Sequence, residues 1–90
     1  MRRLKVVVSP LASEQLEALP EAAQRKVAHA LRVLAHVPLS GRQLPFTYET
    51  YTKLVVLRRG RWTIRIVYRI RGDELRFERT EPGWMPHDLF

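Results

Sequence analysis

A stretch of alternating side chains in the second half of the chain constrains its fold most. From residue 62 to residue 70, aromatic or apolar residues occupy every second position, and the positions between and after them hold Thr63, Arg65, Val67, Arg69 and Arg71. Successive side chains of a strand point to opposite faces of a sheet. The pattern therefore predicts a β-strand with one apolar face, which a second layer must cover, and one face rich in arginine.

The flanking segments supply further elements in a definite order. Residues 4–8 are rich in β-branched valine and predict a first strand, and Ser9 with Pro10 is typical of a helix start. Apolar residues recur at helical spacing over residues 11–19, and again between Pro20 and Pro38. Residues 51–57 and 74–80 predict two more strands, the last one joined to the alternating strand by a tight turn at Gly72.

The order β-α-α-β-β-β predicts an α+β fold, with a helical hairpin packed on one face of a mostly antiparallel sheet. Its 90 residues predict a single domain over residues 1–90. No run approaches the roughly 20 apolar residues of a membrane helix. The basic N-terminus lacks the apolar core of a signal peptide, and the chain has no cysteine. We therefore expect a cytoplasmic protein with no membrane partner.

Charge points to the kind of partner. Lysine and arginine number 16 against 9 acidic residues, which gives a formal net charge of +7 and suggests a polyanionic partner, either nucleic acid, an acidic protein or both. If the apolar strand face meets the helices, then Arg65, Arg69 and Arg76, with Arg58 near them, share the open face. Guanidinium groups pair bidentately with phosphate. The alternative is a solvated face on which Arg69 and Arg76 pair with Glu74 or Glu78.

Histidines supply the remaining candidates for chemistry. His87 lies outside the predicted helices and is the natural general acid or base near neutral pH. The alternative is a C-terminal segment that packs on the edge of the core through Trp84 and Phe90. On the second helix, a stripe more typical of a solvated face than of a nucleic-acid contact contains Arg25, His29, Arg32 and His36. Because His29 and His36 have no Asp, Glu or Cys beside them to complete a ligand set, we expect no metal and no cofactor.

Several segments, taken in order, resemble the RelE/ParE superfamily of toxins from toxin–antitoxin pairs. They are LEALP at residues 16–20, RKV at 25–27, Leu31 and Leu34 ahead of Pro38, GRQL at 41–44 and WTIRIVY at 62–68, the last similar to the family's "yRviY" strand. The resemblance covers nearly the whole chain. It implies the RelE-like fold and, as partner, a cognate acidic antitoxin whose helical or extended segment covers an apolar groove and the basic face.

Members similar to RelE cut messenger RNA on the ribosome, by attack of a 2′-hydroxyl on the adjacent phosphate. By position, the resemblance implies that Arg65 stabilises that phosphate. Together with His87 and Arg58 it forms the predicted catalytic set. The predicted nucleic-acid-binding set is Arg69, Arg76, Arg79, Lys53 and Arg61.

The chain also departs from the RelE pattern. It has apolar residues at 54–57, where such members often carry lysines, and it ends in Phe90, where members that cut RNA often have a functional tyrosine. These departures favour a second hypothesis, a ParE-type inhibitor of DNA gyrase that performs no chemistry. A third is a basic partner-binding module without toxicity.

Overall fold

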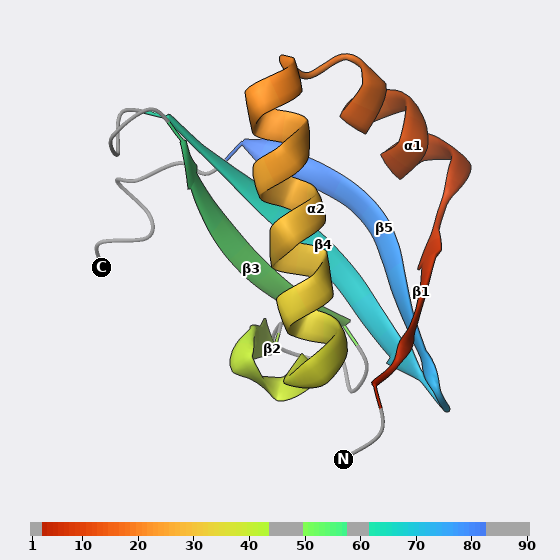
Figure 1. Cartoon of the computed structure of the whole chain (residues 1–90). Helices are drawn as coiled ribbons and strands as arrows, with labels where there is room; N and C mark the ends of the chain where they lie inside the picture. The colour runs from red at the N-terminus through yellow and green to blue at the C-terminus, as the bar shows by residue number, and fades with distance from the viewer. Residues whose placement is uncertain (1–2, 44–49, 58–61, 83–90) are drawn as a thin grey trace.

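The computed structural model describes residues 3–43, 50–57 and 62–82, which form a sheet with both helices on one side of it (Figure 1). The strands form one five-stranded sheet in the order β1-β5-β4-β3-β2. In chain order the elements are β1 (Lys5–Val8), α1 (Pro10–Glu17), α2 (Glu21–His36), the 3₁₀ turn η1 (Pro38–Ser40), β2 (Arg42–Gln43), β3 (Thr50–Leu57), β4 (Trp62–Arg71) and β5 (Glu74–Pro82).

The predicted α+β fold is confirmed, with two additions and one refinement. The additions are η1 and β2, which pairs with β3 through Arg42 opposite Thr52 and Gln43 opposite Tyr51. The refinement concerns β1, which runs parallel to β5, whereas the other strand pairs are antiparallel. The sheet is therefore mixed, with the parallel pair at one edge.

Local sequence signals explain where α1 starts and where the chain turns from β4 into β5. The Ser9 hydroxyl accepts a hydrogen bond from the backbone N–H of Ala12 at 3.0 Å, and Pro10 occupies the first helical turn, so the predicted helix start is confirmed. Between β4 and β5, Gly72 has a φ of +58°, in the left-handed region that favours glycine. The predicted turn between the two strands is therefore confirmed as well.

The core lies between α2 and the side of β4 and β5 that faces the helices. The sheet contributes Ile66, Tyr68, Leu75 and Phe77, all fully buried. The helix contributes a stripe of buried residues, Ala23, Val27, Leu31 and Leu34. Since burial of a large apolar side chain stabilises a fold by about 1.5–3 kcal/mol, this contact between the layers is the main force that fixes which face of β4 is covered.

Tyr68 also joins the sheet to the segment that follows α2. Its hydroxyl donates a hydrogen bond of 2.6 Å to the carbonyl oxygen of Pro38, and its ring stacks on Tyr51 with ring centres 5.6 Å apart. A Cβ at Gly41 would lie 2.1 Å from the Tyr68 hydroxyl oxygen and 2.8 Å from the carbonyl oxygen of Thr52. The close packing of Tyr68 on Gly41 therefore explains both residues. Both lie within the segments that resemble the RelE/ParE superfamily.

Candidate phosphate-binding face of the sheet

The side of the sheet away from the helices carries the arginines of β4. Ile64, Ile66 and Tyr68 are buried toward the helices, so the alternate residues Arg65 and Arg69 point to the opposite side. We call this side, over β3, β4 and β5, the arginine face. Across β4 from β5, Leu54 lies opposite Arg65 and Thr50 opposite Arg69.

Strand β5 adds two more arginines to the same face, the second of them through a β-bulge. Arg76 pairs with Arg69, but the register shifts after Tyr68, so that Phe77 pairs with Tyr68 while Arg79 pairs with Val67. Glu78 is the extra residue between them. Without this shift, strict alternation from Leu75 and Phe77 would turn Arg79 toward the helices. The bulge instead places Arg79 beside Val67 on the arginine face.

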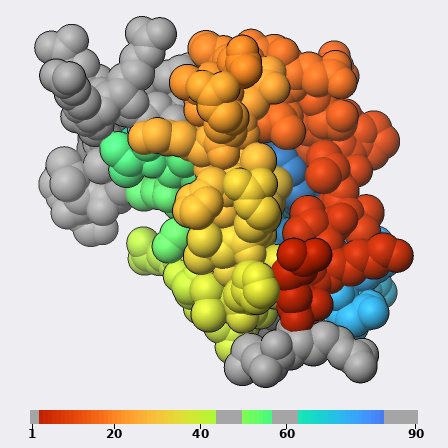
Figure 2. All heavy atoms as spheres, viewed as in Figure 1, coloured from red at the N-terminus to blue at the C-terminus, as the bar shows by residue number. Residues whose placement is uncertain are grey.

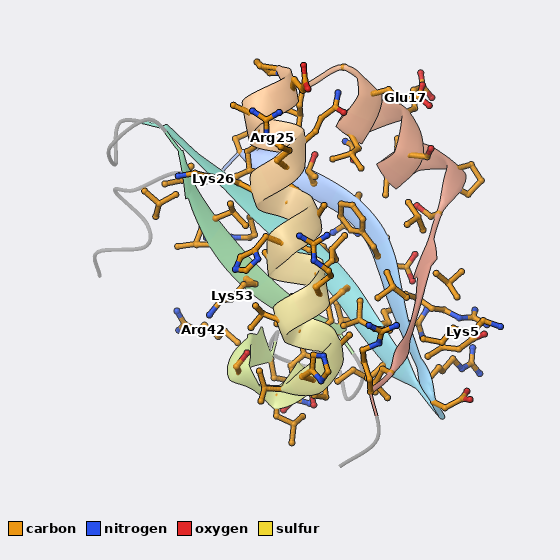
Figure 3. The ribbon with its side chains drawn as sticks, viewed as in Figure 1. Lys5, Glu17, Arg25, Lys26, Arg42 and Lys53 are labelled. Carbon is orange, nitrogen blue, oxygen red and sulfur yellow. The ribbon has the colours of Figure 1, made fainter. Side chains whose placement is uncertain are left out.

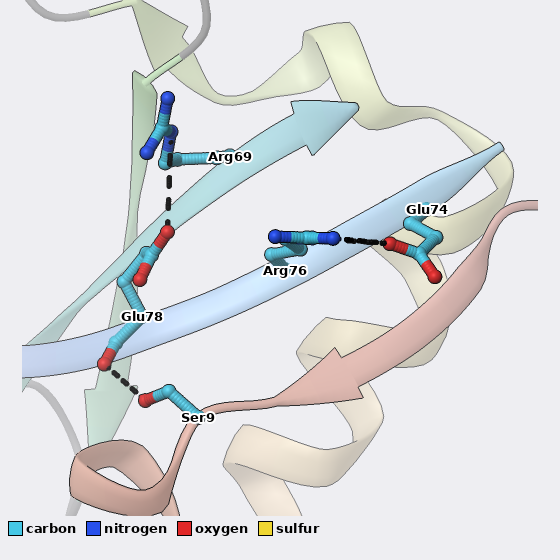
Figure 4. Close-up of polar contacts among 5 residues, drawn as sticks. All are labelled: Ser9, Arg69, Glu74, Arg76 and Glu78. Atoms are coloured by element: carbon cyan, nitrogen blue, oxygen red, sulfur yellow. Dashed lines mark hydrogen bonds and ion pairs between the residues drawn. The ribbon is translucent and has the colours of Figure 1, made fainter. Parts of the chain in front are cut away.

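Carboxylates from β5 are interleaved with these arginines (Figure 4). Arg76 is hydrogen-bonded to Glu74 at 3.0 Å, and the guanidinium of Arg79 contacts Glu81 at 2.9 Å. The ion pair between Arg69 Nε and Glu78 Oε1 is longer, at 3.9 Å. The pairs expected for a solvated face are therefore present. Exposed pairs of this kind stabilise by about 0–1 kcal/mol, so a phosphate can compete for the same guanidinium groups.

The arginine face still has an excess of positive charge and is partly covered. Among the described residues of β4 and β5, the positively charged residues on this face are Arg65, Arg69, Arg71, Arg76 and Arg79. The negatively charged ones are Glu74, Glu78 and Glu81. The alternation alone would suggest that the centre of this face is solvated. It is not, because Val67 is fully buried and Thr52 and Thr63 are nearly so. Arginine groups over a water-poor floor bind anions more strongly than they would in open solvent.

The structure does not bring all of the predicted site residues together. Lys53 pairs with Ile66, so it belongs to the side of the sheet that faces the helices. Arg58, Arg61 and His87 lie outside the described residues. Arg65, Arg69, Arg76 and Arg79 share the arginine face.

A second feature, which sequence analysis could not locate, is a groove between the first half of α2 and β3. It has a volume of about 540 Å³ and is lined by Ala22, Arg25, Lys26, His29, Ala30, Leu54 and Val55. In Figure 2, β3 (green) emerges beside the flank of α2 (orange to yellow). Lys26 reaches across and donates a hydrogen bond of 3.2 Å from Nζ to the carbonyl oxygen of Val56. We call this feature the α2–β3 groove.

Positive charge borders the α2–β3 groove. Figure 3 shows Arg25 and Lys26 on α2, with Lys53 and Arg42 further along the same flank of the helix. Arg25 is paired with Glu21 at 3.0 Å on the exposed surface of the helix. Beyond the groove, the exposed apolar residues nearest to the end of α2 are Val33, Val37 and Leu39. The groove is therefore apolar at its floor and cationic at its rim.

The described ranges contain neither a cluster of side chains able to hold a metal ion nor a helix long and apolar enough to cross a membrane.

The pKa of Tyr68 is strongly shifted within the fold. Burial raises the pKa of Tyr68 to about 12, against a lowering by the hydrogen bond with the Gly41 backbone and with a small further rise from Tyr51. Tyr68 is inside the core, so this shift concerns stability and not the arginine face.

Comparison with known proteins rests on structure. No protein-family model matches the chain, and no curated protein matches it at a significant level. Solved structures with this fold include a chain of the archaeal RelE–RelB complex from Pyrococcus horikoshii OT3, with a TM-score of 0.68 and 16% identity over 90% of this chain and 96% of that one. A chain of the chromosomal ParDE TA system from P. aeruginosa gives a TM-score of 0.65 and 19% identity, over 89% and 96%.

The chain therefore has the fold of these RelE and ParE structures, and the resemblance inferred from the sequence is confirmed at the level of the fold. The two TM-scores are nearly equal, so the fold does not separate a RelE-type protein from a ParE-type one. Any distinction between these functions has to come from side chains and not from the fold.

Proposed function

We propose that this chain is the toxin of a toxin–antitoxin pair and that it cleaves messenger RNA on the ribosome. The observation that carries the proposal is the arginine face, where Arg65, Arg69, Arg76 and Arg79 come together from two neighbouring strands. Neighbouring strands lie roughly 5 Å apart and alternate residues of one strand roughly 7 Å apart. This spacing suits several phosphates of a folded RNA chain better than it suits one small ligand.

In this proposal Arg65 stabilises the phosphate under attack. The reaction adds negative charge to the phosphoryl oxygens when the 2′-oxygen approaches phosphorus, and a fixed guanidinium lowers the energy of that state. Arg65 is half-buried beside Val67, so its charge acts across a partly water-free surface. Arg69, Arg76 and Arg79 hold the flanking phosphates. The ribosome contributes the position of the messenger, as the family resemblance implies, and the setting is the cytoplasm.

Cleavage of a translated reporter messenger in a bacterial extract tests the proposal. Loss of one donor to the charged transition state typically costs 10²–10³ in rate, so we expect Arg65→Ala to slow cleavage about 100-fold. Arg32→Ala is the matched control, because it removes the same charge from the exposed side of α2. We expect its rate to stay within about 3-fold of the unmodified chain. An unchanged rate in folded Arg65→Ala protein would exclude Arg65 from the site.

Expression of the chain in cells tests the ParE-type alternative. Growth arrest with intact messengers and induction of the DNA-damage response would favour inhibition of DNA gyrase. Absence of any growth effect at high expression would exclude both toxin functions and leave the basic partner-binding module.

The partner that we propose is an acidic antitoxin, one segment of which lies in the α2–β3 groove. Both similar structures come from paired proteins, an archaeal RelE–RelB complex and a ParDE TA system. The groove offers apolar contact at Ala22, Ala30 and Val55, and the cations Arg25 and Lys26 complement an acidic chain. Together with the net charge of +7, these features favour a negatively charged occupant.

Co-expression with a short acidic reading frame next to the gene tests this partner. We expect its product to relieve growth arrest and to copurify with the chain. Lys26→Glu should weaken that complex at least 10-fold, because it places a carboxylate at the rim of the groove. Arg32→Glu makes the same charge change outside the groove and should leave binding within about 3-fold. Equal binding by both variants would place the antitoxin elsewhere.

A further inference from the structure

The proposed cleavage needs a group that takes a proton from the 2′-hydroxyl, and the arginine face contains carboxylates that could do so. The described histidines, His29 and His36, are exposed on α2, on the other side of the sheet. Arginine stays protonated in proteins and is a poor base. On the arginine face, the described side chains able to accept a proton near neutral pH are Glu74, Glu78 and Glu81.

Glu78 differs from the other two in its contacts. Glu74 and Glu81 are each hydrogen-bonded to an arginine of the same strand, at 3.0 and 2.9 Å. The ion pair between Glu78 Oε1 and Arg69 Nε is 3.9 Å long, beyond hydrogen-bonding distance. The side chain of Glu78 is 32% exposed, so a substrate hydroxyl can reach it. Its carboxylate is therefore held near positive charge without being engaged at close range by Arg69.

The β-bulge fixes where that carboxylate lies. Glu78 is the extra residue that β5 inserts opposite Tyr68 and Val67, next to Arg79. Its carbonyl oxygen accepts a hydrogen bond of 2.5 Å from the hydroxyl of Ser9, while the Ser9 N–H donates to the carbonyl oxygen of Phe77 at 3.0 Å. Figure 4 shows the side chain of Glu78 directed toward Arg69 and its backbone tied to Ser9. The residue is thus anchored at its backbone and open at its carboxylate.

We propose that Glu78 is the general base of the cleavage, an inference that rests on the proposed function. Its carboxylate accepts the proton of the 2′-hydroxyl as the 2′-oxygen forms a bond to the adjacent phosphorus. The bond from phosphorus to the 5′-oxygen breaks, and that oxygen takes a proton from water. The products are a 2′,3′-cyclic phosphate and a 5′-hydroxyl end. Arg65 neutralises the charge that gathers on the phosphoryl oxygens, as in the proposed function, while Arg69 and Arg79 hold the flanking phosphates.

A purely electrostatic role for Glu78 predicts the opposite effect of its removal. If the carboxylate served to neutralise Arg69, then Glu78→Gln would leave the arginine face more positive. RNA would bind more tightly, and cleavage would stay constant or become faster. A general base predicts slower cleavage with ribosome binding retained. The sign of the change therefore separates the two roles.

The test compares single-turnover cleavage of a ribosome-bound messenger by the full chain and its variants. For Glu78→Gln we expect a rate at least 100-fold lower at pH 7, and ribosome binding within about 3-fold. Glu78→Asp, which keeps the carboxylate, should recover part of the rate. Glu14→Gln, a matched control that makes the same change on the exposed surface of α1, should cleave within about 3-fold of the unmodified chain.

Two outcomes would overturn the inference, and they can be told apart. If the unmodified chain cleaves but Glu78→Gln cleaves within about 3-fold of it or faster, Glu78 is not the base, and the proposed function stands. If the unmodified chain cleaves no translated messenger, the proposed function fails and the role of Glu78 fails with it.

Discussion

Substitution of Gly41 by alanine should destabilise the fold strongly, although Gly41 has a φ of −78° that any residue adopts. The reason is space. The new Cβ would lie 2.1 Å from the hydroxyl oxygen of Tyr68, 2.9 Å from the Cζ atom of its ring and 2.8 Å from the carbonyl oxygen of Thr52. Each separation is below any ordinary contact distance, and one of the three partners is backbone that cannot rotate away.

The size of the effect follows from what must move. Displacement of Tyr68 breaks the buried hydrogen bond of 2.6 Å to Pro38, which costs about 1–3 kcal/mol, and overpacking adds about 1–3 kcal/mol. We therefore expect Gly41→Ala to lower the free energy of unfolding by about 3 kcal/mol. For a domain of this size that corresponds to a fall in Tm of roughly 12–24 °C.

A double-mutant cycle isolates the cause. Tyr68→Phe alone should cost about 1–2 kcal/mol, because it removes the hydroxyl that binds Pro38. It also removes the atom nearest to the new Cβ, so Gly41→Ala should cost at least ~1 kcal/mol less when it is combined with Tyr68→Phe. Urea unfolding followed by circular dichroism measures all four proteins. Additive costs within about 0.3 kcal/mol, or a Gly41→Ala cost below about 0.5 kcal/mol, would refute the packing argument.

Two further predictions concern stability. Ser9→Ala removes the cap of α1 and the hydrogen bond to Glu78, and should cost about 1–2 kcal/mol in urea unfolding; a cost below about 0.3 kcal/mol would contradict the assigned bonds. The buried Tyr68 ionises at a pKa of about 12 in the folded state but near 10 in the unfolded state, so the unfolded chain loses its proton first. Stability should therefore fall by up to about 3 kcal/mol between pH 10 and 12, a loss that Tyr68→Phe should lack.

The side of the sheet on which each β4 side chain lies could be predicted from the sequence. In a strand with strict alternation, burial of one set of side chains places the other set on the opposite side. Burial of Ile66 and Tyr68 toward the helices fixes Arg65 and Arg69 on the other side. The helix start at Ser9 and the turn at Gly72 are likewise local signals, which depend on a few neighbouring residues.

The rest could not be predicted, because it depends on pairing between distant segments. The bulge at Glu78 leaves no mark in the sequence of β5, yet it decides that Arg79 joins the arginine face. β2 is two residues long, too short to show a period. The same limit applies to Lys53: its strand was predicted, but its side of the sheet depends on its register with Ile66. The α2–β3 groove exists only once the helix is packed.

Mapping of RNA ends in cells that express the chain tests the central claim most directly, that the arginine face acts on messenger RNA at the ribosome. We predict new 5′-hydroxyl ends within translated messengers soon after induction. They should be absent from a reporter that lacks its start codon and strongly reduced with Arg65→Ala. Growth arrest with all messengers intact, or equal cleavage of the translated and untranslated reporters, would contradict the claim.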